Sequence, residues 1–161
     1  MNNSIKPDLR NPIHLLAFGF GSGLSPKAPG TMGTLAAIPL FLIINNFNLY
    51  IYLIVLFIII FFGIKICDVT SKDLDVHDHP GIVWDEFAGF LITMTAVPMS
   101  WQTVLAGFLL FRFFDILKPW PIGWLDKKVA GGFGIMLDDI VAGAMAWFVL
   151  QLILNMNWLG Y

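Results

Sequence analysis

Long stretches without a charged side chain constrain this sequence more than any other feature. No Asp, Glu, Lys or Arg occurs between Lys27 and Lys65, between Glu86 and Arg112, or after Asp139. A helix needs roughly 20 apolar residues to cross the hydrocarbon core of a bilayer, and about 17 at the short end. The chain is also only 12% charged, against about 25% for a typical soluble domain. We therefore expect an integral membrane protein whose exterior faces lipid.

Polar or helix-breaking residues divide two of these stretches. Residues 45–48 are Asn-Asn-Phe-Asn, which favour a turn, and Pro98 with Ser100 forms a good helix breaker. Each of the two stretches therefore predicts a helical hairpin. The sequence predicts a single all-α domain over residues 1–161, with about five membrane-embedded helices whose apolar segments are 34–44, 49–64, 87–97, 104–111 and 140–154.

The second hairpin has an alternative, because residues 87–111 could form one long, kinked span. The hairpin is preferred because it places every charged residue at one membrane face and leaves both outer turns and the C-terminal tail uncharged. Positive residues mark the cytoplasmic side, so we expect a cytoplasmic N-terminus and a C-terminus across the membrane. Trp residues near the predicted boundaries suit an interfacial belt; they are Trp101, Trp120, Trp124 and Trp158.

Charge and cysteine content exclude other classes of protein. The net charge is -2 and there is no basic run, so nucleic acid is not an expected partner. Cys67 is the single cysteine, which excludes an intrachain disulfide. Residues 1–10 are polar and do not have the layout of a cleaved signal peptide. The sequence does not predict an oligomeric state.

Acidic residues adjoin three of the apolar segments. Asp85 and Glu86 precede Phe87, and Asp138 with Asp139 precedes Ile140. Asp115 follows Arg112 by three residues, on the same helical face. Carboxylates at the edge of hydrocarbon are costly and are functional candidates by default, and their hard oxygen atoms suit Mg²⁺. The alternative is that the pairs cap helices.

The Gly-rich segment 19–34 is a candidate phosphate loop. Glycines let backbone amides converge on an anion, and a following helix start adds positive potential. Hydroxyl groups are available there from Ser22, Thr31 and Thr34. The alternative is a re-entrant turn without a ligand. Arg112 and Lys118, the latter expected where a helix ends before Pro119, could hold phosphate or could merely reach the interface.

Other polar residues have weaker interpretations. His77, Asp78 and His79 form a polar cluster, in which one histidine could act as an acid or base, although a solvated loop is favoured for either histidine taken alone. Asp73-Leu74-Asp75-Val76 fits an aspartyl-phosphate motif, which should end a buried apolar strand, but Thr70-Ser71-Lys72 precedes it. We place both of these aspartates in a solvated loop. No arginine follows Cys67 by five or six residues, so a cysteine-phosphatase loop is absent.

Four segments taken in order resemble the signatures of the phosphatidylglycerophosphatase A family. The first combines Gly21-Ser22-Gly23-Leu24 with Ala28-Pro29-Gly30-Thr31-Met32-Gly33-Thr34, and the second combines Val76-His77-Asp78-His79 with Ile82-Val83-Trp84-Asp85-Glu86. The third combines Phe111-Arg112-Phe113-Phe114-Asp115 with Lys118-Pro119-Trp120-Pro121, and the fourth is Gly131-Gly132-Phe133-Gly134-Ile135-Met136-Leu137-Asp138-Asp139-Ile140-Val141-Ala142-Gly143. Together they span roughly residues 12 to 145.

This resemblance implies hydrolysis of phosphatidylglycerophosphate to phosphatidylglycerol and phosphate, with Mg²⁺ as cofactor, in a bacterial inner membrane. It implies that Asp85, Glu86, Asp138 and Asp139 form the metal and catalytic centre. Beside these we take Asp115, His79 and Lys118 as candidate catalytic residues. Candidate phosphate-binding residues are Ser22, Thr31, Thr34, Arg112 and Lys118. A cation or proton transporter and a non-catalytic assembly subunit are the rival interpretations.

Overall fold

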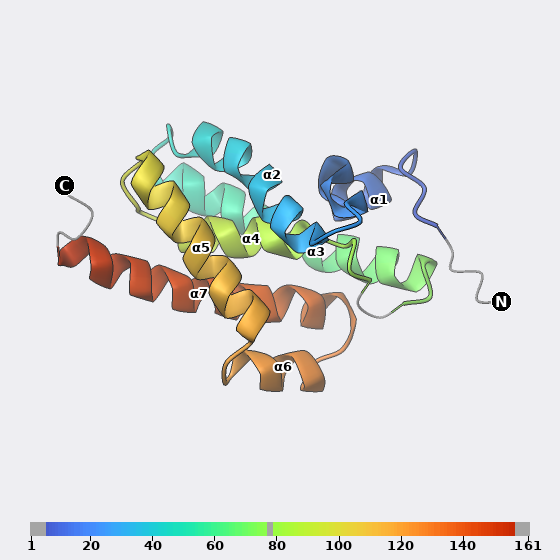
Figure 1. The fold of residues 1–161 in the computed structure, drawn as a ribbon. Coiled ribbons are helices and arrows are strands. Elements are labelled where there is room, and N and C mark those ends of the chain that lie inside the picture. Colours follow the sequence, from blue (N-terminus) through green and yellow to red (C-terminus); the bar gives the residue numbers. More distant parts are fainter. Residues whose placement is uncertain (1–5, 77–78, 157–161) are drawn as a thin grey trace.

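The computed structural model describes residues 6–76 and 79–156, and no strand occurs within them (Figure 1). His77, Asp78 and Trp158 of the sequence predictions lie outside these residues. The elements in chain order are α1 (Pro12–Ala17), a 3-10 helix η1 (Gly19–Leu24), α2 (Pro29–Ile44), α3 (Leu49–Asp73), α4 (Trp84–Thr93), α5 (Trp101–Leu117), α6 (Ile122–Lys128) and α7 (Gly131–Asn155). The prediction of an all-helical fold is confirmed.

The first hairpin consists of α2 and α3, and its turn falls where the asparagines predict it. The side chain of Asn48 caps α3 by accepting a hydrogen bond of 3.0 Å from the N–H of Ile51. Helix α3 continues well past the predicted end at Ile64 and stops at Asp73. Asp73 therefore ends a helix, where it contacts Nε2 of His14 at 3.1 Å, so its placement in a loop was wrong, although its side chain is about half-exposed.

The second hairpin also forms, because α4 and α5 are separate helices. Ser100 begins α5 with a capping box in which Ser100 and Thr103 bond to each other's backbone. A single kinked helix over residues 87–111 is therefore excluded. Helix α4 has only 10 residues, which is about 15 Å of helix and about half of a hydrocarbon core.

Two helices, α3 and α7, are long and apolar enough to cross a membrane, while α2 is a shorter apolar helix. Only 22% of the most apolar part of α3 is buried, whereas the core helix of a soluble protein would be mostly buried. Large apolar side chains such as Ile54, Phe57 and Phe61 are exposed along it. These features support a membrane protein, but five crossings are not confirmed.

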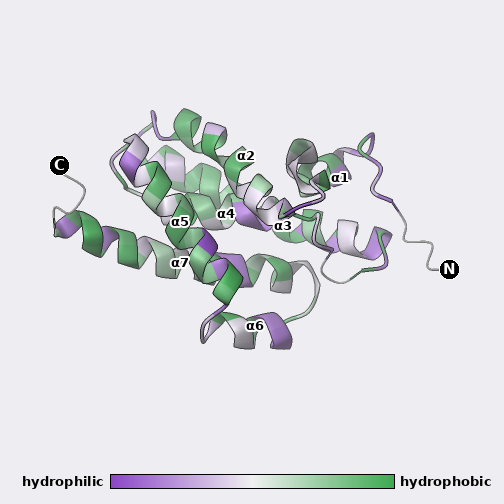
Figure 2. Ribbon diagram, viewed as in Figure 1, coloured by the Kyte–Doolittle hydropathy of each residue, from purple (hydrophilic) through white to green (hydrophobic). Residues whose placement is uncertain are grey.

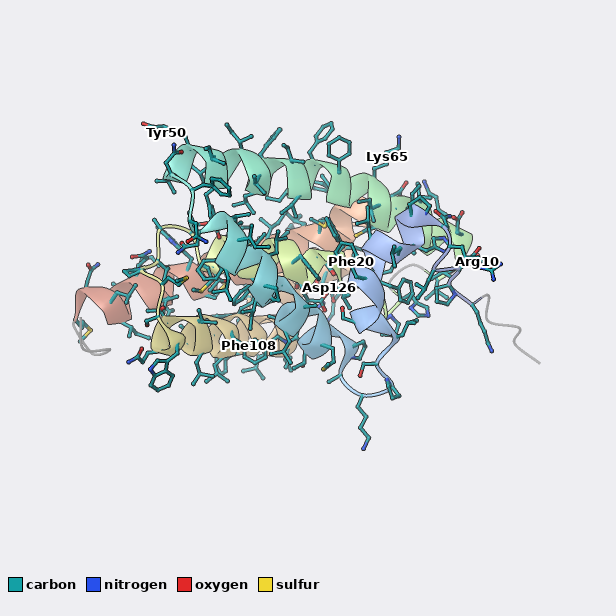
Figure 3. All side chains as sticks on the ribbon, turned by 90° about the horizontal axis from the view of Figure 1, so that it is seen from above. Arg10, Phe20, Tyr50, Lys65, Phe108 and Asp126 are labelled. Carbon is teal, nitrogen blue, oxygen red and sulfur yellow. The ribbon has the colours of Figure 1, made fainter. Side chains whose placement is uncertain are left out.

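The two ends of the bundle differ in charge. The turn after α2, the turn before α5 and the end of α7 lie together at one end, and the N-terminal segment lies at the other (Figure 1). In Figure 3, Tyr50 marks the uncharged end of α3, while Lys65 and Arg10 lie toward the opposite end. The described boundary tryptophans Trp101, Trp120 and Trp124 are all exposed. This polarity agrees with the predicted one-sided arrangement of charge.

Helix α4 lies at the centre of the fold and is buried along its whole length. Phe87, Phe90 and Leu91 are among its most enclosed side chains, and α4 packs against α7, α2 and α3. Its hydrophilic start and a hydrophilic part of α7 lie between mostly hydrophobic helices (Figure 2). The polar residues of these two helices therefore meet inside the bundle.

Candidate active site

A close crossing of α4 and α7 positions the acidic residues. A Cβ atom on Gly143 would collide with the carbonyl oxygen of Gly89, and a Cβ on Gly89 would lie 2.8 Å from the carbonyl oxygen of Asp139. The hydroxyl of Thr93 spans the crossing, donating to Gly89 O at 3.0 Å and lying 3.3 Å from Gly143 O. Small residues allow backbones to approach in this way. The crossing therefore brings both acidic pairs to one level of the bundle.

Three carboxylates meet there, those of Asp85, Glu86 and Asp139. One oxygen from each can be chosen so that all three lie within 4.8 Å of one another. Their residues are at most 9% exposed. Asp138 is also buried but is not part of this closest group.

Helix capping does not explain Asp138 and Asp139, whereas Asp85 and Glu86 lie where acidic side chains favour the helix dipole. Helix α7 starts at Gly131, so Asp138 and Asp139 lie about two turns inside it. Asp85 and Glu86 do lie in the first turn of α4, but the N-cap residue is Val83 and no side chain caps that helix. Acidic groups buried in the interior of a helix need another stabilising partner.

Arg112 supplies one such partner. Its Nη1 lies 2.5 Å from Oδ2 of Asp115 and 3.7 Å from Oε1 of Glu86. All three side chains are at most 13% exposed. Within the described part of the chain, Nε of Arg112 and Oε2 of Glu86 are buried without a hydrogen-bond partner. Buried polar atoms are normally paired, so these two atoms are available to a ligand.

The start of α2 lies directly over this pair. A Cβ atom on Gly30 would collide with Oε1 of Glu86 and lie 3.1 Å from both Nη atoms of Arg112. The first intrahelical bond at this end runs from Met32 N–H to Ala28 O, so the amides of Gly30 and Thr31 precede the helical ladder. No side chain caps the helix. Both amides and the positive end of the helix dipole are thus next to Arg112.

The three hydroxyls predicted to bind phosphate have different surroundings. Ser22 donates to Gly19 O at 2.9 Å, and the buried Thr34 donates to Gly30 O at 2.9 Å. Thr31 is half-buried on the first turn of α2. Of the three, Thr31 stands nearest in sequence to the amides beside Arg112, while Ser22 and Thr34 bond to their own segments.

Lys118 ends α5, as the sequence predicted, in a left-handed conformation with φ of 42°. Its Nζ lies 2.6 Å from Oδ2 of Asp138 and 2.7 Å from Oδ1 of Asp126. Burial lowers the pKa of Lys118, but the hydrogen bonds to the two aspartates raise it by more, so the lysine remains a cation. Sequence reasoning missed Asp126, because this acid stands beside Lys127 and Lys128 as on an ordinary solvated helix.

His79 lies apart from the carboxylates in its described contacts. Its Nδ1 accepts a hydrogen bond of 3.0 Å from Gly81 N–H, and its ring lies 5.5 Å from that of Phe18. It lines a cavity of about 450 Å³ together with residues that include Ser25 and Pro29. The cavity reaches the segment that starts α2, so an acid or base role for His79 stays a prediction.

The donor set fits a divalent cation. Asp85, Glu86, Asp115 and Asp139 offer carboxylate oxygens, and Arg112 is the cation paired among them. Buried carboxylates in excess of their counterions favour a metal ion, and oxygen ligands favour Mg²⁺. The unpaired Oε2 of Glu86 agrees with this assignment.

Long, apolar and largely exposed helices, together with a buried acidic cluster that lies between two cations, are the features expected of a helical membrane protein with a polar site inside its bundle. The chain belongs to the phosphatidylglycerophosphatase A family, whose family model matches residues 15–154. It is a family of phosphatases by name, and the resemblance seen in the sequence motifs is confirmed.

The chain aligns with individual relatives over most of its length. It is 53% identical to phosphatidylglycerophosphatase A of Escherichia coli (strain K12), over 90% of this chain and 85% of that protein. It is 50% identical to the protein of the same name from Haemophilus influenzae, over 92% and 93%. A putative phosphatidylinositol-3-phosphatase of Bacteroides thetaiotaomicron is 33% identical, over 84% and 89%. No solved structure matches the chain significantly.

Proposed function

We propose that this protein hydrolyses phosphatidylglycerophosphate to phosphatidylglycerol and phosphate, using Mg²⁺, at the cytoplasmic face of a bacterial inner membrane. Family membership supports the reaction. The structural observation that carries the proposal is the meeting of three buried carboxylates with Arg112 and the uncapped start of α2. This arrangement joins a cation site to an anion site, as a metal-dependent phosphatase requires.

Asp85, Glu86 and Asp139 are the residues proposed to hold Mg²⁺, with Asp138 as a fourth candidate. A bound divalent cation would polarise a phosphoryl oxygen or make a water molecule more acidic. The same carboxylates would orient a water molecule near the phosphate by accepting hydrogen bonds from it. In this proposal Asp115 contributes to catalysis indirectly, because its ion pair with Arg112 holds the guanidinium in position.

Arg112 and the amides of Gly30 and Thr31 are proposed to bind the phosphate monoester. A guanidinium presents several N–H donors to phosphate oxygens, and a helix start is a ready anion site. Lys118 is proposed to reach the departing oxygen or a phosphate oxygen, where its charge stabilises the transition state. The hydroxyl of Thr31 adds a donor, while Ser22 and Thr34 remain weaker candidates because they already donate within the chain.

The position of the site along the helices supports catalysis at a membrane face. From Asp139 to the end of α7 at Asn155 there are 16 residue steps, or about 24 Å of helix, compared with a hydrocarbon core of about 30 Å. The charged residues lie at the other end of the bundle. A substrate can therefore place its headgroup at the acids while its tails stay in the bilayer.

The rival transporter interpretation requires polar groups at several depths. No charged residue lies beyond Asp139 in α7 or between Glu86 and Arg112, which disfavours a path through the membrane. A different lipid phosphate is a second candidate substrate, because one relative carries the name of a putative phosphatidylinositol-3-phosphatase.

The deciding experiment measures phosphate release by the purified, detergent-solubilised protein. Phosphatidylglycerophosphate and phosphatidylinositol 3-phosphate are supplied separately, with Mg²⁺ and with EDTA. We expect release from the first substrate only when Mg²⁺ is present, with recovery when Mg²⁺ is added back after EDTA. Release that persists in EDTA contradicts the metal assignment, and faster release from the inositol lipid contradicts the proposed substrate.

A further inference from the structure

An apolar groove runs between α5 and α7 on the outside of the bundle. It has a volume of about 360 Å³ and is lined by Phe114 of α5 and by Ile140, Val141, Ala144, Met145, Phe148 and Val149 of α7. None of these side chains is charged, and small Ala144 lies between the bulkier residues. The volume is within the range of ligand pockets, about 300–1,000 Å³.

Two lining residues of the groove are sequence neighbours of residues in the acidic site. Phe114 directly precedes Asp115, which pairs with Arg112, and Ile140 directly follows Asp139 of the carboxylate cluster. From Ile140 to Val149 the lining follows one face of α7 for about 14 Å. It runs toward the uncharged end of the bundle, where α7 terminates (Figure 1).

This direction matches the shape of one particular kind of ligand. A phospholipid has a charged head and long apolar chains, so its head is expected at carboxylates, metal and Arg112, and its chains in hydrocarbon. A groove that starts at sequence neighbours of the site and is purely apolar toward the membrane interior provides the same sequence of environments. Phe148 is 59% exposed, which leaves the groove open to a chain entering sideways from the bilayer.

We propose that the groove between α5 and α7 binds one acyl chain of the phospholipid substrate, and that it aligns the headgroup with the carboxylate cluster. The proposal rests on the proposed function, because it takes the phosphate site to be the site of hydrolysis. An acyl chain in a micelle or bilayer is already in apolar surroundings, so the groove contributes to binding through closer packing around the chain.

The test compares long-chain and short-chain substrates on a variant that fills the groove. Ala144→Phe is assayed with dioleoyl- and dihexanoyl-phosphatidylglycerophosphate in mixed micelles, with KM expressed as a mole fraction. We expect KM for the dioleoyl substrate to rise at least fivefold, with kcat nearly unchanged. The dihexanoyl substrate, whose chains are too short to follow the groove to Val149, should show a clearly smaller rise in KM than the dioleoyl substrate.

Ile58→Phe is the matched control, because Ile58 is 47% exposed on α3 and lies outside the groove. It should leave both substrates unaffected. Val149→Phe at the far end of the groove gives a second test. It should raise KM for the dioleoyl substrate but not for the didecanoyl substrate. Equal loss on long and short chains, or no loss with any chain, overturns the proposal. If the unmodified protein releases phosphate from neither substrate, it is the proposed function that fails.

Discussion

The Nζ atom of Lys118 lies 2.6 Å from Oδ2 of Asp138. The adjacent residue, Asp139, instead joins Asp85 and Glu86 in the carboxylate cluster. Neighbouring residues on a helix point about 100° apart, so two adjacent acids can serve two different partners. The motif Asp138-Asp139 therefore combines one carboxylate for the proposed metal with one that holds a cation, and the two should respond differently to substitution.

Replacing Asp139 by Asn should abolish most activity and raise the Mg²⁺ concentration needed for half-maximal rate. Loss of a residue that merely supports a metal ligand costs about 10–100-fold, so loss of a ligand should cost at least as much. Asp138→Asn should lower kcat with a smaller change in Mg²⁺ requirement, since its neutral amide still accepts a hydrogen bond from Lys118. Mg²⁺ titrations of initial rate measure both effects.

Asp75→Asn is the control for this carboxylate-to-amide change. Asp75 is exposed and has a φ of 53°, a left-handed conformation that asparagine tolerates. It should retain full Mg²⁺-dependent turnover. Identical Mg²⁺ curves for Asp138→Asn and Asp139→Asn would mean that both bind the metal, as the sequence motif predicts. Full activity of Asp139→Asn would contradict the proposed site.

Asp126 is expected to position Lys118 from the other side. Asp126→Asn removes one of the two ion pairs of Lys118 but leaves its contact with Asp138. A half-exposed ion pair contributes about 1 kcal/mol or less, so kcat should fall about two- to fivefold with KM nearly unchanged. Lys118→Met, which removes the cation itself, should lose much more, and Asp126→Glu should recover most of the rate. A loss in Asp126→Asn as large as that in Lys118→Met contradicts a positioning role.

Thr31→Val tests the start of α2 as a phosphate site. The change preserves size and removes one hydroxyl donor. A hydrogen bond to a charged group contributes about 1.5–3 kcal/mol, so kcat/KM should fall about 13- to 160-fold while the thermal unfolding midpoint stays nearly constant. Thr34→Val, whose hydroxyl already donates to Gly30 O, should lose less. Unchanged kinetics in Thr31→Val would mean that this hydroxyl does not touch the substrate.

The main helices could be predicted from the sequence because turn-forming residues divide the long uncharged stretches. Asn45–Asn48 separates two apolar segments, and Pro98 with Ser100 separates two more, so α2, α3, α4 and α5 were all expected. The extension of α3 to Asp73 was not expected, because Lys65, Asp68 and Lys72 resemble a loop when only hydropathy is considered. In the structure Lys72 and Asp68 form an i,i+4 ion pair at 2.6 Å, which is compatible with a helix.

The sequence indicated which acidic residues would lie close together better than it indicated which cation each would pair with. Acids at the edges of apolar segments pointed to Asp85, Glu86 and Asp139, which the structure brings together. Which of Asp138 and Asp139 faces the carboxylate cluster depends on how α7 is rotated about its axis. The close backbone contact between Gly89 and Gly143 fixes that rotation. The ion pair between Asp126 and Lys118 forms because α6 turns back toward the end of α5. No periodic pattern in the sequence predicts that turn.

The arrangement of the bundle across the membrane yields a final prediction. The turn at 45–48, the turn before α5 and the end of α7 share one uncharged end (Figure 1), whereas Asp75 lies toward the charged end. Lys and Arg are retained on the cytoplasmic side, so the uncharged end should face the periplasm.

In a Cys67→Ser background, Asn46→Cys and Ser100→Cys should therefore react with a membrane-impermeant thiol reagent added to intact spheroplasts. Asp75→Cys should react only after the membrane is opened. The short α4 makes Ser100 the sharper position, because an arm of about 15 Å is only about half of a hydrocarbon core. Labelling at Asn46 with protection at Ser100 in intact spheroplasts would place the second turn inside the bilayer and show that α4 and α5 form a re-entrant hairpin rather than two crossings.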